Sequence, residues 1–462
     1  NLAMTKVPLL LLSVAASMTS GLTTTEYQIT SAEALAAHTT LGAQLVLLDT
    51  ASSDGNWTYA KTLFQQTVAT AHGQPISLEN IGRLHQQGSD VDLFVSYYGT
   101  ADYASTFVNA AITNTAPFDG ALTDKMRAEL TMKGVVLQSV TMGALNTLRT
   151  SIDKCVAKVD VGNANGAPSY VDLAWALFSA KKSEIALGEK RCPQFNTCLP
   201  NDQTLPPQSS KSIVNNVLLG LFHQARKNAQ DGQCWALQNN VELIAAQLTI
   251  PVIQGMLREA YEVDPSADGV ADGLVEVCEG WGFAAAVLPR IARCNATAGT
   301  IVNENMNTVS FITSTPAGSK GVYMKDGFQT VVDAVENTFA CLGITCQEVK
   351  AMVAKGTSHP LWQSCRLELN NKDNNQMSIS KEEYETWRQI GVAFIVISIA
   401  LTGLLCFSMF CSDERKHQQG RGRRQSRGAS DLCAAPRAEP ENLELHEALQ
   451  VGTLEVTVEG RE

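Results

Sequence analysis

The sequence predicts a mainly α-helical protein: a helical ectodomain of two related lobes, a single C-terminal transmembrane helix and a disordered cytoplasmic tail. Three observations support this prediction. Apolar residues recur with the 3.6-residue period of helices from Ser31 to about Ala354, with few alternating, strand-like runs. Residues 390–411 form an uncharged apolar run of membrane-spanning length. Residues 412–462 contain few large apolar side chains, which is typical of disorder.

The first residues have the order of a secretory signal peptide. Met4 and Lys6 are followed by the apolar run VPLLLLSVAASM and then by small and polar residues, so we assign residues 1–21 to a cleaved signal peptide. A signal peptide and one later membrane helix are the organisation of a type I membrane protein, with its ectodomain outside the cell at the plasma membrane. In that compartment two sequons predict a glycoprotein: Asn56-Trp-Thr and Asn295-Ala-Thr.

Helical periodicity and its interruptions divide the ectodomain into segments. Stretches rich in Pro, Gly and Asn interrupt the pattern at residues 161–168, 193–211 and 264–269. The amphipathic stretches around them predict helices at residues 57–72, 102–113, 124–155, 170–184, 212–230, 235–248, 251–262, 274–293 and 323–339.

Two of these helical stretches repeat each other. LFQQTVATAHGQ at residues 63–74 matches LFHQARKNAQDGQ at residues 221–233, with coincident apolar stripes. LTMKGVVLQ at residues 130–138 recurs loosely as LTIPVIQ at residues 248–254, in the same order. The repeat predicts two related lobes, and the alternative is that two Ala- and Gln-rich helices look alike by chance. The predicted lobes are residues 22–205 and 206–317.

Residues 318–389 are expected to form a Cys-containing juxtamembrane region and stalk. Within them, ELNNKDNNQMSISKEEYETW at residues 368–387 begins and ends like a calcium-binding helix-loop-helix. The ligand register fails, because Lys372 takes the first ligand position and Met377 stands where a Gly allows the sharp turn. A polar stalk is therefore favoured, with a calcium loop as the alternative.

The run at residues 390–411, IGVAFIVISIALTGLLCFSMFC, has no charge, Pro or amide side chain. As a helix it reaches about 30 Å, the thickness of a bilayer's hydrocarbon core. A buried core helix is the alternative, but such helices normally show one polar face. Lys and Arg residues gather after the run, at positions 415–427, and Trp387 precedes it as an interfacial anchor. Residues 412–462 are therefore expected in the cytoplasm.

Cysteine usage agrees with an extracellular ectodomain. Nine of the twelve cysteines lie before residue 390, where an oxidising compartment favours disulfides. Because nine is an odd number, one thiol should stay free or pair with another chain. Cys192 and Cys198 are close enough in sequence for a small loop, as are Cys341 and Cys346, but the connectivity stays open.

Charge and motifs argue against several classes of function. The formal net charge of -11 disfavours nucleic acid as a partner and is compatible with cation binding. The sequence contains no Gly-rich phosphate loop, no G-x-S-x-G elbow and no C-x-x-C pair. We therefore expect a binding protein that is not an enzyme.

Hard oxygen ligands cluster in one segment. Tyr97, Tyr98, Asp102 and Tyr103 lie within seven residues, although the whole chain has only nine tyrosines. Phenolate and carboxylate oxygens suit a hard trivalent cation such as Fe(III), and a bound metal lowers the pKa of a coordinating group. Tyr98 and Asp102 stand four apart and share a helix face. The alternative is aromatic packing at a corner between helices.

A second group of oxygen ligands lies further along the chain. It comprises Glu259 and Tyr261 in GMLREAYEVD, and Glu279 in CEGWGFAAAV. Asp172 in VDLAWALF has a nearby Trp, as Glu279 has. A carboxylate beside a Trp on an Ala-rich helix is either a buried, hydrogen-bonded acid or a ligand, and both interpretations stay open.

Four ordered motifs resemble one known family. VSYYGTADYASTFVNAAI, DLAWALFSAKKSEIALGEKRCPQFNTC, PVIQGMLREAYEV and EGWGFAAAVLPRIARCNA are similar to segments of the low-iron-inducible Fea-type periplasmic proteins of green algae and of the membrane-anchored phytotransferrins of marine microalgae. The similarity covers roughly residues 56–307. The expected signal peptide, membrane helix and tail match the anchored branch.

The resemblance implies a surface protein for iron uptake. It implies that ferric iron is held with carbonate as a synergistic anion and is internalised by endocytosis, with cycling through endosomes and a surface reductase or the endocytic machinery as partner. The family's ligands are not transferred to this chain, so the residues above stay the metal candidates. Carbonate would need a cation or a helix N-terminus beside the metal, and Arg127 is the candidate. The tail has no strict endocytic signal. A metal-free adhesion or signalling receptor and a helical ectoenzyme remain alternatives.

Overall fold

The computed structural model describes residues 27–71, 74–84, 89–118, 120–158, 166–199, 212–264, 273–307, 323–354 and 360–365. This part of the chain is mainly helical, as predicted. The expected signal peptide, most of the stalk, the membrane helix and the tail lie outside the described residues.

The described elements are fifteen α-helices, two short helices of other types and four short strands. The α-helices are α2 (Ala32–Ser53), α3 (Trp57–Gln65), α4 (Ser89–Tyr98), α5 (Tyr103–Thr113), α6 (Asp124–Lys133), α7 (Thr141–Val156), α8 (Ala167–Ser179), α9 (Glu184–Arg191), α10 (Ile213–Gln230), α11 (Cys234–Val263), α12 (Leu274–Cys294), α13 (Ala296–Met306), α15 (Phe328–Glu336), α16 (Phe339–Leu342) and α17 (Cys346–Val349). The others are the 3₁₀ turn η1 (Ile81–Arg83), the π-helical stretch η2 (Gly134–Val140) and the strands β1 (Thr67–Ala71), β2 (Gln74–Ser77), β3 (Ala351–Val353) and β4 (Pro360–Gln363).

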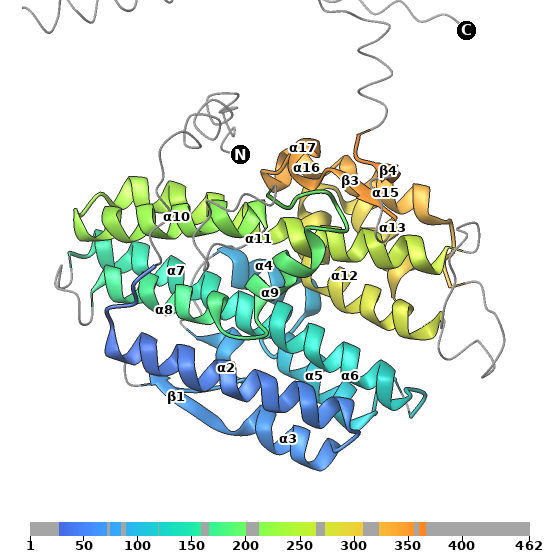
Figure 1. Ribbon diagram of the computed structural model, residues 1–462, viewed down its shortest axis with the longest axis horizontal. Coiled ribbons are helices and arrows are strands. Elements are labelled where there is room, and N and C mark those ends of the chain that lie inside the picture. Colours follow the sequence, from blue (N-terminus) through green and yellow to red (C-terminus); the bar gives the residue numbers. More distant parts are fainter. Residues whose placement is uncertain are drawn as a thin grey trace, which may run out of the picture. The chain divides into compact units, whose positions relative to one another are not determined.

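The described helices pack in layers around a large apolar core (Figure 1). A separate, smaller apolar cluster comprises Val91, Phe94, Tyr103, Ala104 and Met142. α7 and α8 lie in the middle, with α2 against α8 on one side and α10 and α11 on the other. α12 packs against α11, α13 and α6. Helices from both predicted lobes therefore share one core, which runs from Tyr27 to Trp362. The division into two related lobes remains a prediction.

The predicted helix at residues 57–72 is wrong in its second half. α3 ends at Gln65, and Thr67–Ala71 forms strand β1, which pairs antiparallel with Gln74–Ser77. The β-branched side chains of Thr67 and Val68 favour an extended strand over a helix. The repeated segment further along the chain continues as helix α10 to Gln230, so the structural likeness of the two copies stops at Gln65.

Two stretches that were predicted as separate helices are joined in the structure. Predicted stretches 235–248 and 251–262 form one continuous helix, α11, with Pro251 inside it. Pro251 removes one backbone hydrogen bond, and the buried residues on both sides hold the helix together by packing. α11 is long and apolar enough to span a membrane by length and composition, but 89% of its apolar window is buried, as in a core helix.

The long predicted helix at residues 124–155 is interrupted by a wider turn. α6 continues directly into the π-helical stretch η2, and η2 continues directly into α7. Helix α5 comes very close at this point: a Cβ placed on Gly134 would lie 2.7 Å from a methyl carbon of Val108. A side chain at position 134 would therefore push α5 away.

The described cysteines pair as four disulfides. They are Cys155–Cys234, Cys192–Cys198, Cys294–Cys341 and Cys346–Cys365, and Cys278 is a buried free thiol. The expected Cys192–Cys198 loop and the single unpaired cysteine are confirmed. The suggested Cys341–Cys346 loop is not formed, since each of these cysteines pairs with a more distant one.

Asp172 is a buried acid that fastens the start of the described chain to α8. Its carboxylate accepts hydrogen bonds from the Tyr27 hydroxyl (2.8 Å), from the backbone and hydroxyl of Thr30 (both 2.9 Å) and from the backbone of Ser31 (3.1 Å). Arg226 of α10 adds an ion pair at 3.2 Å. Of the two interpretations of Asp172, the structure shows the hydrogen-bonded core acid.

Candidate metal centre

The predicted tyrosines lie together where α4 turns into α5. The rings of Tyr98 and Tyr103 stack with centroids 5.5 Å apart and an angle of 16° between their planes. Phe94 contacts both rings, at 6.4 Å from Tyr98 and 5.3 Å from Tyr103. The tight connection between the helices uses Gly99 at φ 74°, a conformation that glycine adopts without strain.

The two phenol groups are withdrawn from water. The Tyr98 hydroxyl donates a 2.6 Å hydrogen bond to the backbone oxygen of Ala285 in α12, whereas the buried Tyr103 hydroxyl has no hydrogen-bond partner among the described residues. Burial raises the pKa of Tyr98 well above its ordinary value, with further contributions from Tyr97 and Tyr103, and burial likewise raises the pKa of Tyr103. Both phenols are therefore protonated at neutral pH unless a cation replaces the protons.

Asp102 does not join the stacked tyrosines. Its carboxylate pairs with the Arg83 guanidinium, and its side chain is 48% exposed. Asp102 precedes the first residue of α5, whereas Tyr103 is buried in the small apolar cluster with Phe94. The prediction that Tyr98 and Asp102 share one helix face is wrong, because α4 ends at Tyr98 and Asp102 lies beyond that end.

A different carboxylate lies on the inner side of α4. Asp90, Phe94 and Tyr98 are spaced four residues apart along this helix and so share one face. The charges of Asp90 and Arg290 both act on the Tyr103 hydroxyl, in opposite directions. The structure thus brings Asp90, rather than Asp102, to the side of the helix that carries the tyrosines.

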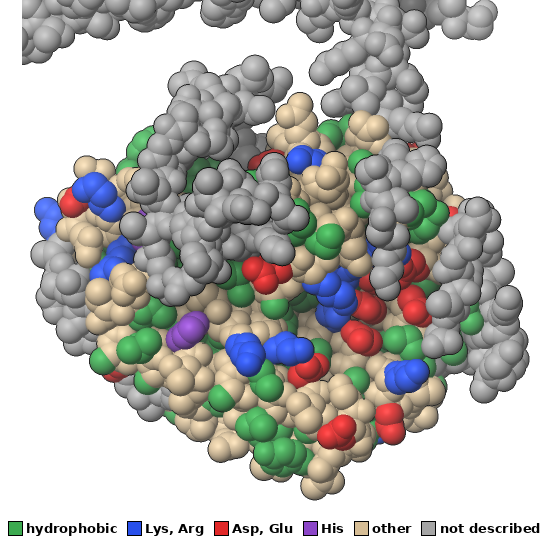
Figure 2. Space-filling view, viewed as in Figure 1, with side chains coloured by type: hydrophobic (Ala, Val, Ile, Leu, Met, Phe, Trp, Pro, Cys, Tyr) green, Lys and Arg blue, Asp and Glu red, His purple; other side chains and the backbone are tan. Residues whose placement is uncertain are grey.

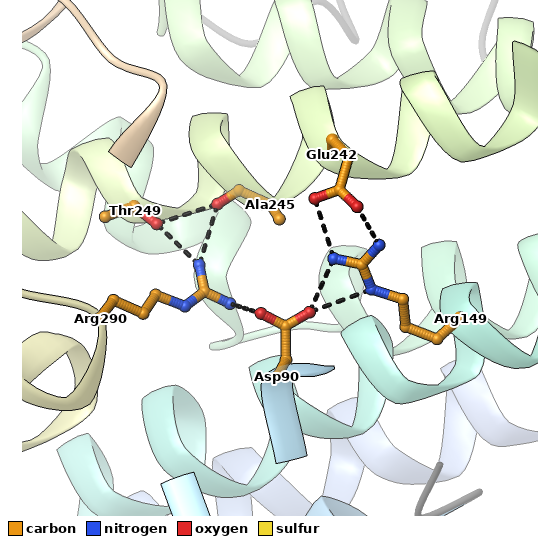
Figure 3. Close-up of polar contacts among 6 residues, drawn as sticks. All are labelled: Asp90, Arg149, Glu242, Ala245, Thr249 and Arg290. Carbon is orange, nitrogen blue, oxygen red and sulfur yellow. Dashed lines mark hydrogen bonds and ion pairs between the residues drawn. The ribbon is translucent and has the colours of Figure 1, made fainter. Parts of the chain in front are cut away.

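Two arginines from distant helices hold Asp90 (Figure 3). Arg149 of α7 donates from Nε (3.1 Å) and from one terminal nitrogen (2.9 Å) to one carboxylate oxygen, and Arg290 of α12 donates to the other at 3.2 Å. Burial alone would raise the pKa of Asp90, but Arg290 and Arg149 outweigh burial and lower it. Asp90 is therefore an ionised carboxylate in a dry setting.

The arginines are positioned in turn by α11. Arg149 also pairs with Glu242, which is 56% exposed. Arg290 donates to the backbone oxygen of Ala245 (3.2 Å) and to the Thr249 hydroxyl (2.9 Å) (Figure 3). These contacts link α4, α7, α11 and α12 through one charged group.

Arg127, the residue expected to hold carbonate, is occupied elsewhere. Its guanidinium donates to the backbone oxygens of Ala111 (3.2 Å) and Ile112, at the C-terminal end of α5. It also lies over the Trp57 ring, 3.7 Å from the centroid. Tyr103 stands at the opposite end of α5, so the structure does not bring Arg127 to the tyrosines.

The second group of predicted ligands forms a network of ion pairs. Arg191 contacts Glu259 at 3.0 Å and Glu279 at 3.2 Å, while Glu279 also pairs with Lys133 (3.0 Å) and Lys190 (3.2 Å). On the face in Figure 2, acidic and basic side chains are likewise intermingled. These carboxylates already have cationic partners and would have to leave them to bind a metal ion.

A close contact between helices makes this network compact. A Cβ placed on Gly282 of α12 would lie 2.5 Å from the Cβ of Lys133 in α6. Tyr261 is not part of the network, because its ring packs edge-on against Phe328 with centroids 5.4 Å apart. Among the described residues, no three His, Cys, Asp or Glu side chains are grouped as ligands for one metal ion.

The two carboxylates of the network differ in acidity. Burial, reinforced by Glu279, raises the pKa of Glu259 to about 8. Burial also acts to raise the pKa of Glu279, but Lys133, Lys190 and Arg191 outweigh it and lower this pKa to about 2. The network thus contains one carboxyl group that resists ionisation and one that resists protonation.

Replacing Glu259 with glutamine is expected to change how stability depends on pH. The folded protein holds the Glu259 proton more tightly than the unfolded chain, whose pKa is about 4.3, so this group's contribution falls as pH rises from about 4.3 to about 8. Glu259→Gln removes that loss. Urea unfolding should show the variant gaining stability relative to the parent between pH 5 and pH 8, and a constant difference would contradict this. Glu304→Gln, at an exposed pair with Lys325, is the control.

Sequence reasoning missed Asp90, Arg149 and Arg290. Arg290 carried a signal, since it stands alone in the apolar run AAAVLPRI of a core helix. An arginine in that position needs a buried anionic partner, although its position does not tell which one. Asp90 carried no comparable signal, because an acidic residue in a helix's first turn is common.

No protein-family model, curated protein or solved structure matches this chain. The site therefore has to be interpreted from its own chemistry.

Proposed function

We propose that the protein is a cell-surface ferric-iron-binding protein for high-affinity iron uptake, with carbonate as synergistic anion and endocytic internalisation. The observation that supports this most is the group at the turn from α4 to α5. Tyr98 and Tyr103 stack there, and the buried Tyr103 hydroxyl has no partner among the described residues. Asp90, on the same face of α4 as Tyr98, is held by two arginines. Tyr98, Tyr103 and Asp90 would supply the oxygen ligands for iron, which is the protein's cargo.

The charges of this group suit ferric iron together with carbonate. A ferric ion with two tyrosinates and one aspartate has no net charge. Arg149 and Arg290, released from Asp90 when it turns to the metal, would then face the carbonate with two guanidinium groups, of which Arg149 stays paired with Glu242. Guanidinium groups bind planar oxyanions through two parallel hydrogen bonds, which fits this exchange of partners.

The alternative group at Glu259 and Glu279 supports iron less well. Glu279 has three cationic partners, and Glu259 is more stable in its neutral form than as a ligand anion. Tyr261 lies outside that group. The tyrosine group is the better candidate because, within the described part of the chain, the Tyr103 oxygen has no hydrogen-bond partner and no cation pairs directly with either phenol.

Changing both tyrosines tests this proposal. Full-length protein with Tyr98→Phe and Tyr103→Phe should lose ferric-iron binding in equilibrium dialysis with bicarbonate, by on the order of 100-fold or more in affinity. Because both phenols are protonated without metal, binding to the parent should release two protons, so the affinity should fall as pH falls.

The controls separate lost ligands from lost folding. Tyr59→Phe removes a phenol that is 44% exposed on α3 and should bind iron like the parent. The double variant keeps both aromatic rings, so its unfolding midpoint should change little. Undiminished iron binding by a folded double variant would exclude the tyrosines as ligands, and equal affinity at pH 5 and pH 7.5 would contradict tyrosinate ligation.

A further inference from the structure

The two most exposed large apolar side chains of the described residues flank a single disulfide. Trp235 is 77% exposed and Val156 is 67% exposed. Each follows one half of the Cys155–Cys234 disulfide, whose Cα atoms are 5.5 Å apart. The disulfide joins the end of α7 to the start of α11, so the backbone positions that carry these two exposed side chains are held close together.

This apolar pair, Trp235 and Val156, lies in surroundings of mixed charge. Lys227 is paired with Asp231 at 2.6 Å just before Trp235, and Lys154 lies 5.8 Å from the centre of the Tyr170 ring. The described neighbours of the pair thus include both basic and acidic side chains. A Trp and an aliphatic side chain in neutral surroundings suit the interface of a bilayer, where the indole ring lies at the level of the lipid headgroups.

The length of chain beyond the described residues brings a bilayer within reach. Twenty-four residues, 366–389, separate the last described residue from the expected membrane helix. Such a segment spans at most roughly 80 Å, and a compact body of about 340 residues has a radius of gyration of about 20 Å. A tether of this length allows any face of the ectodomain to contact the membrane. The effective concentration of the ectodomain at the membrane surface is then of the order of millimolar.

We propose that Trp235 and Val156 form a membrane-contacting tip that inserts into the interface of the bilayer in which the protein itself is anchored. The occupant of this surface is uncharged, zwitterionic lipid. The proposal rests on the membrane helix expected at residues 390–411, but it does not depend on iron binding. Two side chains alone would bind lipid weakly, and the tether makes this weak contact persistent.

Brominated lipids test the contact directly, because bromine quenches tryptophan fluorescence at short range. The full chain is reconstituted in phosphatidylcholine vesicles with and without brominated acyl chains. The fluorescence of Trp235 is obtained as the difference between the parent and Trp235→Phe. At least half of this difference signal should be quenched by brominated lipid, equally in low salt and in 0.5 M NaCl (roughly a 4 Å Debye length).

Further variants keep the outcomes distinct. Val156→Asp should release the Trp235 signal from quenching, whereas Leu35→Asp, at an exposed apolar position on α2, should not. If brominated lipid does not quench Trp235 in anchored protein, the proposal is wrong. Protection of Trp235 from both brominated lipid and aqueous acrylamide also overturns it, because a second copy or another protein would then cover the side chain. Quenching of Trp387 reports separately whether the chain is anchored.

Discussion

Replacing Asp172 with alanine is expected to lower the free energy of unfolding by about 3–5 kcal/mol, the usual effect of removing one partner from a buried ion pair. The side chain of Asp172 is 1% exposed, and the variant would leave the Arg226 charge without its carboxylate. The Tyr27 hydroxyl and the backbone N–H groups of Thr30 and Ser31 would also lose their acceptor. The start of the described chain would then detach from α8.

Urea unfolding of the full chain measures this change, with tryptophan fluorescence as one probe because the Trp175 ring packs against Tyr27, with centroids 4.9 Å apart. The matched control is Asp231→Ala, which removes an acid that is 41% exposed and paired with Lys227 one helical turn away. Exposed pairs of this kind contribute about 0.3–0.5 kcal/mol. Similar losses of unfolding free energy in the two variants would show that Asp172 does not hold the start of the described chain against α8.

Replacing Asp90 with asparagine is expected to reduce ferric-iron affinity by on the order of 100-fold or more, since it removes a ligand charge while keeping the side chain's size. The amide can still accept a hydrogen bond from Arg149 or Arg290. It cannot provide the negative charge that ferric iron requires. Competition with a chelator of known affinity measures the change, and the unfolding midpoint shows whether the variant is folded.

Two further variants show whether the effect is specific. Asp92→Asn changes an exposed acid two residues along the same helix, and Asp102→Asn changes the acid that pairs with Arg83. Both should bind iron like the parent. If Asp102→Asn weakens binding and Asp90→Asn does not, the site lies on the outer side of the α4–α5 turn, as the sequence alone suggested.

The sequence predicted most helices because local periodicity determines them. Ser212–Gln230 and Leu274–Arg293 are close to α10 and α12 as found. The errors arose where packing or strand propensity overrode the pattern. β-branched residues formed β1 after Gln65, and Pro251 did not end α11 because the helix is buried along most of its length.

The sequence predicted the tyrosines of the candidate site but not their charged neighbours. The concentration of tyrosines marked Tyr98 and Tyr103, because both lie in one short segment. Their charged neighbours come together only through tertiary packing: Arg149 is 59 residues and Arg290 is 200 residues from Asp90. No local pattern encodes such contacts. The same holds for Arg127, which was suitably placed in sequence but stabilises the other end of α5.

The central claim is that Tyr98 and Tyr103 bind ferric iron as tyrosinates. A titration of the full-length protein with a ferric chelate, followed by visible absorption with and without bicarbonate, tests it most directly. Ferric tyrosinate has a visible charge-transfer band, so the band should grow to one iron per chain with bicarbonate, weaken without it, and be absent in the Tyr98→Phe, Tyr103→Phe variant. No band at saturation, or an unchanged band in that variant, would contradict the claim.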